Sequence, residues 1–144
     1  LSYQKNMSQT KNFFKISKKY LSKDGILVCD FLNKKNLIYS KPRQKFKFSR
    51  KKNLHISRYA IPELIKSKNI IKIKYYFSIF DIKKKEARQF TESHTMQYFD
   101  LKFIKKIVKE NNLKILKIGE PGLDLNRKKA NLKSWVLTLV AQRV

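Results

Sequence analysis

The side chains best suited to chemistry lie in the stretch Gln89–Phe99, which reads QFTESHTMQYF. If this stretch is a strand, successive side chains point to opposite faces of a sheet. One face then carries Phe90, Glu92, His94, Met96 and Tyr98. A carboxylate and an imidazole on the buried side of a sheet cost free energy unless they pair or face a wet pocket. Glu92 and His94 are therefore either a hydrogen-bonded pair at a strand edge or part of a row of side chains that lines a substrate pocket.

The length and composition indicate one folded domain. The chain has 144 residues, of which 42% are hydrophobic, and this is close to ordinary globular usage. It contains no run of about 18 or more uncharged apolar residues, so no membrane span is expected, and no secretory signal is visible. The lone cysteine, Cys29, lies in an apolar run and cannot form an internal disulfide. We expect a buried Cys29 in a cytoplasmic protein.

The strong positive charge raises the question of nucleic-acid binding. The net charge of +25 comes from 35 lysine and arginine residues against 10 acidic ones. Nearly all are lysines, which are spread along every segment and which we interpret as solvated faces. Arginine, the better residue for bidentate contacts, is scarce, and no recognition-helix, zinc or glycine-rich RNA-binding signature is present. Specific nucleic-acid binding is not expected, whereas a lysine-rich module that binds nucleic acid non-specifically stays an alternative. No histidine, cysteine and aspartate cluster has metal-ligand spacing, so no metal is expected.

The first third of the chain is typical of an α/β fold. A helix is predicted from a cap at Ser8 or Thr10 to about Leu21, because apolar residues recur at helical spacing. Turn chemistry at Lys23–Gly25 ends it. The nearly continuous apolar run Ile26–Leu32 then fits a strand that is covered on both faces.

The middle of the chain changes to a period of two. After a predicted loop over Asn33–Lys45, apolar and polar residues alternate up to Phe99, which indicates antiparallel strands with short turns. The alternating apolar positions are Phe46 and Phe48, Leu54 and Ile56, and the odd-numbered residues from Ile71 to Ile79. The pattern predicts an antiparallel β insert on an α/β domain.

The end of the chain returns to the α/β pattern. We predict a helix over Asp100–Asn111, capped by Asp100, and a strand over Leu113–Ile118. A loop over Gly119–Lys133 follows. The last strand, Ser134–Ala141, has apolar residues on both faces and should lie inside the sheet rather than at its edge.

The order of these parts resembles the C-terminal half of class I S-adenosylmethionine-dependent methyltransferases. The resemblance rests on a leading LSYQ, on KYLSKDGILVCDFLN from Lys19 to Asn33, on F-x-E-x-H-x-M-x-Y-F from Phe90 to Phe99, and on a final W-x-L-x-x-V-A strand. It is closest to the small-molecule branch that includes aminosugar N-methyltransferases. Asp24 stands where that family usually has the first of two glycines.

The resemblance implies a Rossmann-like sheet whose last strand is antiparallel and lies between two others. It also implies that residues 1–144 form a partial methyltransferase domain. Within this domain, residues 33–99 would form a loop and an antiparallel β insert that caps the substrate. The family's glycine-rich cofactor loop has no counterpart here, because the only glycines are Gly25, Gly119 and Gly122. We therefore expect the N-terminal cofactor-binding half to be absent, and the chain alone to bind S-adenosylmethionine poorly.

The resemblance also implies roles for individual residues in methyl transfer to a small-molecule acceptor. His94 is the candidate general base, because an imidazole ordinarily titrates near pH 6.5. Glu92 and Tyr98 would orient the acceptor or the imidazole, Tyr3 would form the pocket wall, and Ser2 would border the cofactor. The alternatives are a structural hydrogen bond for His94, and a non-catalytic α+β protein for the whole chain.

Overall fold

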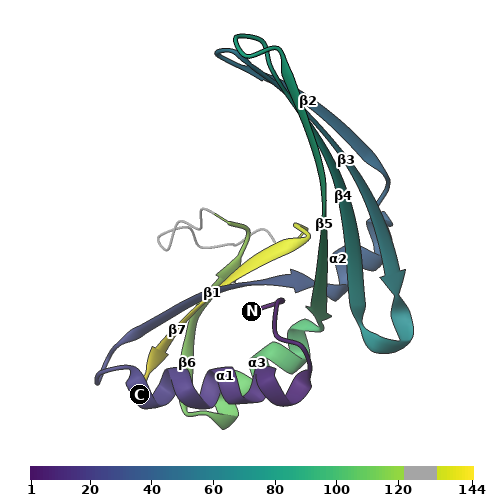
Figure 1. Ribbon diagram of the computed structural model, residues 1–144. Coiled ribbons are helices and arrows are strands. Elements are labelled where there is room, and N and C mark those ends of the chain that lie inside the picture. The colour runs from purple at the N-terminus through teal and green to yellow at the C-terminus, as the bar shows by residue number, and fades with distance from the viewer. Residues whose placement is uncertain (122–132) are drawn as a thin grey trace. The chain divides into compact units, whose positions relative to one another are not determined.

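The computed structural model describes residues 1–121 and 133–144, and these fall into two compact units (Figure 1). The first unit consists of Leu1–Ser40 and Met96–Val144, and the second of Lys41–Thr95. Most of the predicted loop over Gly119–Lys133 lies outside the described residues. No helix among the described residues is long and apolar enough to cross a membrane.

The first unit combines helices with the strands β1, β6 and β7. Its elements are α1 (Met7–Tyr20), β1 (Ile26–Asn33), α2 (Lys34–Ser40), the end of β5 (Glu86–Phe99), α3 (Leu101–Glu110), β6 (Leu113–Gly119) and β7 (Val136–Arg143). Strand β7 lies between β1 and β6 and is antiparallel to both. Strand β1 pairs in parallel with β5 at Leu32 and Tyr98. The predicted interior position and direction of the last strand are confirmed.

The helix ends show where local sequence decides structure. Asp100 caps α3 as predicted, because its side chain accepts a hydrogen bond from the Lys102 N–H at 2.8 Å. The cap of α1 is Asn6, whose Oδ1 accepts from the Gln9 N–H at 2.9 Å. The prediction of Ser8 or Thr10 was wrong, because the cap lies two residues before Ser8 and four before Thr10. Thr10 Oγ1 instead donates to the Asn6 carbonyl.

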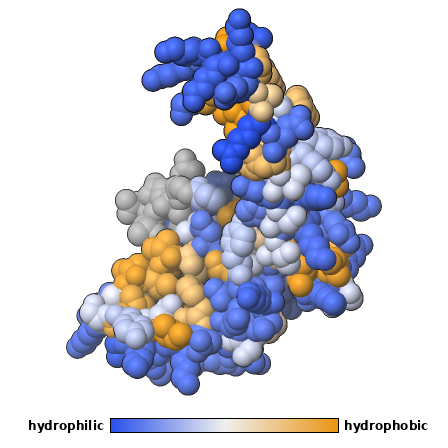
Figure 2. All heavy atoms as spheres, in the orientation of Figure 1, coloured by the Kyte–Doolittle hydropathy of each residue, from blue (hydrophilic) through white to orange (hydrophobic). Residues whose placement is uncertain are grey.

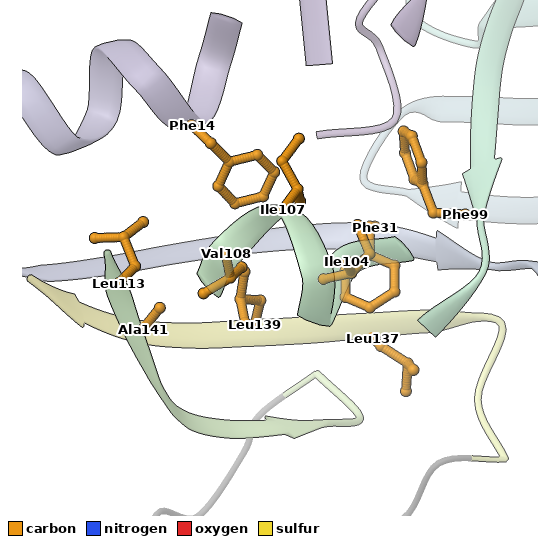
Figure 3. Packing of buried hydrophobic residues seen from close by; sticks show 10 residues of the cluster. All are labelled: Phe14, Phe31, Phe99, Ile104, Ile107, Val108, Leu113, Leu137, Leu139 and Ala141. Carbon is orange, nitrogen blue, oxygen red and sulfur yellow. The ribbon is translucent and has the colours of Figure 1, made fainter. Parts of the chain in front are cut away.

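The hydrophobic core of the first unit lies between the two long helices and one face of β1 and β7 (Figure 3). Ten buried residues form it: Phe14, Phe31, Phe99, Ile104, Ile107, Val108, Leu113, Leu137, Leu139 and Ala141. Burial of a large apolar side chain stabilises a fold by about 1.5–3 kcal/mol. This cluster therefore holds the helices on the sheet.

The other face of β1 is less covered than predicted. Ile26 is 46% exposed and Val28 is 61% exposed, so the prediction of a strand covered on both faces was wrong for this half of β1. A hydrophobic area is visible at the lower left of Figure 2, where β1 and β7 lie in Figure 1. The core cluster lies on the opposite face of β1, which carries Leu27, Cys29 and Phe31.

The segment after β1 is a helix rather than the predicted loop. Helix α2 runs over Lys34–Ser40 and buries Leu37, which is 1% exposed. The Asn36 side chain donates to the Ser134 carbonyl at 3.2 Å, and Trp135 Nε1 donates to Ser40 Oγ. A helix this short has little intrinsic stability, and its tertiary contacts are what stabilise it.

The second unit is an antiparallel sheet, as the period of two predicted. It contains β2 (Lys45–Lys51), β3 (Leu54–Ile65), a short 3-10 helix (Lys66–Lys68), β4 (Ile70–Asp81) and the first part of β5. Because β5 runs through both units, the hydrogen-bonded order is β2-β3-β4-β5-β1-β7-β6. The fold is a mixed α/β fold with a seven-stranded sheet.

Candidate functional site

Glu92 and His94 lie on the same face of β5 and form a pair. The His94 Nε2 to Glu92 Oε2 distance is 3.5 Å, and the side chains are 31% and 51% exposed respectively. The Tyr75 ring packs against the imidazole at 5.2 Å between centroids, with an interplanar angle of 86°. The pair is thus neither buried in a closed core nor fully solvated, and solvent reaches both groups.

Arg58 extends this polar group and was missed by the sequence analysis. Its guanidinium carbon lies 5.1 Å from the centroid of Tyr75, the ring that also packs on His94. Arg58 Nε is buried and has no hydrogen-bond partner among the described residues. A buried donor without a partner costs free energy. Arg58, Tyr75, Glu92 and His94 therefore form one cluster around the Tyr75 ring, in which Glu92 and His94 are open to solvent.

A signal for Arg58 is present in the sequence. It is one of few arginines in a lysine-rich chain and lies in the alternating stretch HISRYAI. The register pairs it with Phe77, which stacks on Phe90 at 4.8 Å. Only this cross-strand pairing places Arg58 on the same face as His94.

The leading segment of the chain bridges β1 and β5 in the first unit. The Leu1 nitrogen donates to the Asp30 carbonyl at 2.8 Å, and Ser2 Oγ accepts from the Leu32 N–H at 2.9 Å. On the other side, the Ser2 carbonyl accepts from the Gln97 N–H at 2.7 Å. Ser2 is buried, and these hydrogen bonds fix its position between the two strands.

A small pocket opens beside this segment. Its volume is about 190 Å³, and its lining includes Ser2, Tyr3, Asp30, Leu32, Met96 and Val136. The Tyr3 side chain is 62% exposed and stands at the pocket wall. The Asp30 carboxylate accepts a hydrogen bond from the Thr138 hydroxyl. The pocket is mainly apolar with a carboxylate at its side.

Tyr98, the remaining predicted site residue, lies apart from the lining of this pocket. It is only 2% exposed, and its hydroxyl has no hydrogen-bond partner among the described residues. Desolvation by burial raises the pKa of the Tyr98 phenol. Ser2, Tyr3 and Tyr98 belong to the first unit, whereas Glu92 and His94 belong to the second.

The pocket beside Ser2 is too small to enclose a whole nucleoside-containing cofactor. Ligand pockets generally have volumes of about 300–1,000 Å³, and this one has about 190 Å³. An apolar pocket with one carboxylate suits the methyl-bearing, positively charged end of S-adenosylmethionine. No residue that the structure describes supplies a glycine-rich loop for the rest of that molecule, because only Gly25 and Gly119 are described.

Metal and thiol chemistry find little support. Within residues 1–121 and 133–144, no group of three or more histidine, cysteine, aspartate or glutamate side chains could hold a metal ion. Burial raises the pKa of the Cys29 thiol to about 11. A thiol with that pKa is almost entirely protonated at neutral pH, so Cys29 is a poor nucleophile.

Several solved methyltransferase structures share this fold. An S-adenosylmethionine-dependent methyltransferase from Clostridium acetobutylicum superimposes with a TM-score of 0.75 at 16% identity. DesVI from Streptomyces venezuelae gives 0.77 at 14% identity. CalS10, an amino pentose methyltransferase from Micromonospora echinaspora solved with S-adenosylmethionine bound, gives 0.70 at 11% identity.

These matches cover nearly all of this chain but only part of each solved structure. Each covers 99% of this chain but 54% of the solved structure, so the chain spans about half the length of these proteins. No family model and no curated protein matches the chain. The structural matches confirm the resemblance in fold to half of a methyltransferase, including sugar-modifying members.

Proposed function

We propose that the chain forms the acceptor side of an S-adenosylmethionine-dependent methyltransferase that acts on a small molecule. The observation that carries the proposal is the fold, which matches half of several such enzymes over 99% of the chain. The acceptor class we propose is an amine, such as an aminosugar. Two of the matching proteins are described as an amino pentose methyltransferase and a sugar N-methyltransferase.

In this proposal the Arg58, Tyr75, Glu92 and His94 cluster receives the acceptor, and the unit Lys41–Thr95 is its cap. His94 Nε2 takes a proton from the acceptor ammonium, which leaves the nitrogen lone pair free. The Glu92 carboxylate, 3.5 Å from that nitrogen, then stabilises the imidazolium. Glu92 also offers a negative charge to a cationic acceptor in a unit that is otherwise rich in lysine.

On the cofactor side, we propose that Ser2 and Tyr3 border the methyl-bearing end of the donor. S-adenosylmethionine supplies a methyl group that is already activated on a sulfonium, so the protein mainly has to position the reactants. The buried Ser2 is held rigidly by both strands, while the Tyr3 ring shapes the pocket wall. The orienting role of Tyr98 stays a prediction, because its side chain is buried and lies apart from the pocket lining. We propose a cytoplasmic location, where a lone cysteine stays reduced.

Methyl transfer to a panel of amines, measured with radiolabelled S-adenosylmethionine, tests the proposal. An aminosugar should be methylated, and His94→Ala should lower turnover by about 10²–10⁴-fold. Part of that loss should be recovered at high pH, where the acceptor amine loses its proton without a base. Tyr39→Ala, which alters a side chain that is 89% exposed, is the matched control.

Two outcomes would count against the proposal. Absence of methyl transfer to any amine in the panel would reject the acceptor class. Turnover by His94→Ala that matches the unsubstituted protein at every pH would reject the base role and leave Glu92 and His94 as a structural pair.

A further inference from the structure

The face of the second unit that points away from Arg58 and His94 carries aligned aromatic side chains. We call it the aromatic face. Paired residues of an antiparallel sheet lie on the same face, and the register gives three rows across β2, β3 and β4. These rows are Arg50–His55–Phe80, Phe48–Ser57–Ser78 and Phe46–Tyr59–Tyr76.

The aromatic side chains of this face are open to solvent. The exposed fractions are 62% for Phe46, 53% for Phe48, 38% for Tyr76 and 40% for Phe80. Exposed apolar residues are ordinary when scattered, but several on one face mark an interaction surface. Two concavities lie on this face, of about 460 and 310 Å³, and Tyr76 lines both.

Cations accompany these rings. The Arg50 guanidinium lies 5.8 Å from the Phe48 centroid, and Lys74 Nζ lies 5.0 Å from the Tyr76 centroid. Residues 41–95 contain 16 lysines and arginines against 4 carboxylates. None of these lysines and arginines forms an ion pair with a carboxylate of the described chain. Their charge is therefore available to an external anion.

The ends of two hairpins add a further group of cations. The Ile82 N–H donates to the Asn53 carbonyl at 2.8 Å, which holds the β2–β3 turn against the β4–β5 turn. Lys51 ends β2, and the turns themselves carry Lys52, Lys83, Lys84 and Lys85. The upper part of Figure 2 accordingly shows mainly hydrophilic side chains with hydrophobic ones among them. The row that contains Arg50 and Phe80 lies next to these turns, because Lys51 pairs with Leu54 and Leu54 with Asp81.

We propose that the aromatic face binds single-stranded nucleic acid without sequence preference. Bases would stack on Phe46, Phe48 and Tyr76, while the phosphates would lie against Arg50, Lys74 and the lysines of the two turns. A four-stranded sheet with exposed aromatics is a known platform for unpaired bases, and stacking combined with positive charge is tolerant of sequence. This inference is independent of methyl transfer, because it uses the opposite face of the sheet.

Other occupants fit these observations less well. A second copy of the chain would bring two positively charged faces together, and an anionic lipid surface has no rings to stack. A duplex keeps its bases paired and stacked, so it could use the cations but not the aromatic side chains.

Fluorescence anisotropy on the whole 144-residue chain tests the proposal. The probes are labelled oligo(U), oligo(dT) and a mixed-sequence duplex, each of about 16 nucleotides per strand. Both single strands should bind more tightly than the duplex. Tyr76→Ala and Phe46→Ala should each weaken single-strand binding by about 5- to 150-fold with little effect on the duplex. Lys74→Ala should lower the slope of log affinity against log salt by about one.

Tyr39→Ala, which removes an exposed tyrosine from the first unit, should leave every affinity unchanged. Circular dichroism of each variant shows whether it is folded. If an alanine variant is unfolded, Phe46→Leu, which removes the ring but keeps an apolar side chain, is measured instead. Equal affinities of the Tyr76 variant and the unsubstituted chain for oligo(U) would overturn the proposal. A loss that is the same for duplex and single strand would do so too. Tyr76→Ala could instead abolish dimerisation or binding to phosphatidylserine vesicles and leave oligo(U) binding unchanged. That outcome would assign the aromatic face to a different partner.

Discussion

The two units of the chain are stabilised in different ways. The first buries ten hydrophobic side chains in one cluster between helices and strands. In the second, the buried hydrophobic residues among those described are Ala60 and Ile71. Its sheet relies on the backbone ladders and on ring contacts such as Phe77 with Phe90. A unit with few buried side chains leaves many of them available for binding, and this is where both proposed binding faces lie.

The largest contrast between the units is expected for removal of a large side chain. Leu139 is fully buried in the first unit. Its replacement by alanine should lower the free energy of unfolding of the protein by about 2–5 kcal/mol. Phe48→Ala in the second unit should cost less than about 1 kcal/mol, because Phe48 is 53% exposed. Urea unfolding followed by circular dichroism measures both. Equal losses would show that the second unit has a core of comparable strength.

Cysteine reactivity extends the contrast to chemistry. Because burial raises the pKa of Cys29 from 9.0 to about 11, its thiolate fraction at pH 8 is about a hundredfold below that of an ordinary thiol. Iodoacetamide should therefore modify Cys29 at least about a hundredfold more slowly than a cysteine placed at the exposed Ser49, in the variant Cys29→Ser with Ser49→Cys. The Cys29 rate should rise with pH up to about 11. A Cys29 rate that levels off near pH 9 would contradict the raised pKa.

The turn before β1 tests how tightly the first unit is built. A Cβ on Gly25 would lie 2.9 Å from the Ser22 carbonyl oxygen, so Gly25→Ala should cost about 1–3 kcal/mol in thermal or urea unfolding. Asp24 has a φ of 63°, in the left-handed region that favours glycine. Asp24→Gly should therefore be neutral or stabilise by up to about 1 kcal/mol. A loss of stability in Asp24→Gly would show that the aspartate side chain has a role of its own.

Within the second unit, the stack of Phe77 on Phe90 should give a measurable coupling. The ring centroids are 4.8 Å apart with an interplanar angle of 13°. A double-mutant cycle with alanine at both positions should give a coupling of about 0.5–1.5 kcal/mol. The same cycle between Phe77 and Tyr39, an exposed residue of the first unit, is the control and should give none. A Phe77–Phe90 coupling near zero would mean that backbone pairing alone maintains this sheet.

The smallest effects are expected for two tyrosine hydroxyls, one from each unit. The Tyr98 hydroxyl is buried and has no partner among the described residues, so Tyr98→Phe should raise stability by up to about 1 kcal/mol. The Tyr59 hydroxyl donates to Gln44 Oε1, so Tyr59→Phe should lower stability by about 0.5–1.5 kcal/mol. Thermal unfolding distinguishes the two signs. A destabilised Tyr98→Phe would reveal a hydrogen bond that involves this phenol.

Much of the candidate site followed from the alternation of residues in one strand. The pattern in Gln89–Phe99 predicted a strand with Glu92 and His94 on one face, and the structure has both in β5, 3.5 Å apart. The helix cap at Asp100 and the direction of the last strand were predicted equally well. The roles assigned to Ser2, Tyr3, Glu92, His94 and Tyr98 stay predictions.

What the sequence determined by itself is the type and order of the elements, because backbone periodicity and helix caps act over a few residues. The tertiary structure decided which faces are covered and which distant residues meet. It made α2 a helix through the burial of Leu37 and left Val28 exposed on β1. It also brought Arg58 and His94, from two different strands, to the same Tyr75 ring. Such contacts depend on cross-strand register and on packing between segments far apart in the chain, and no local pattern specifies these.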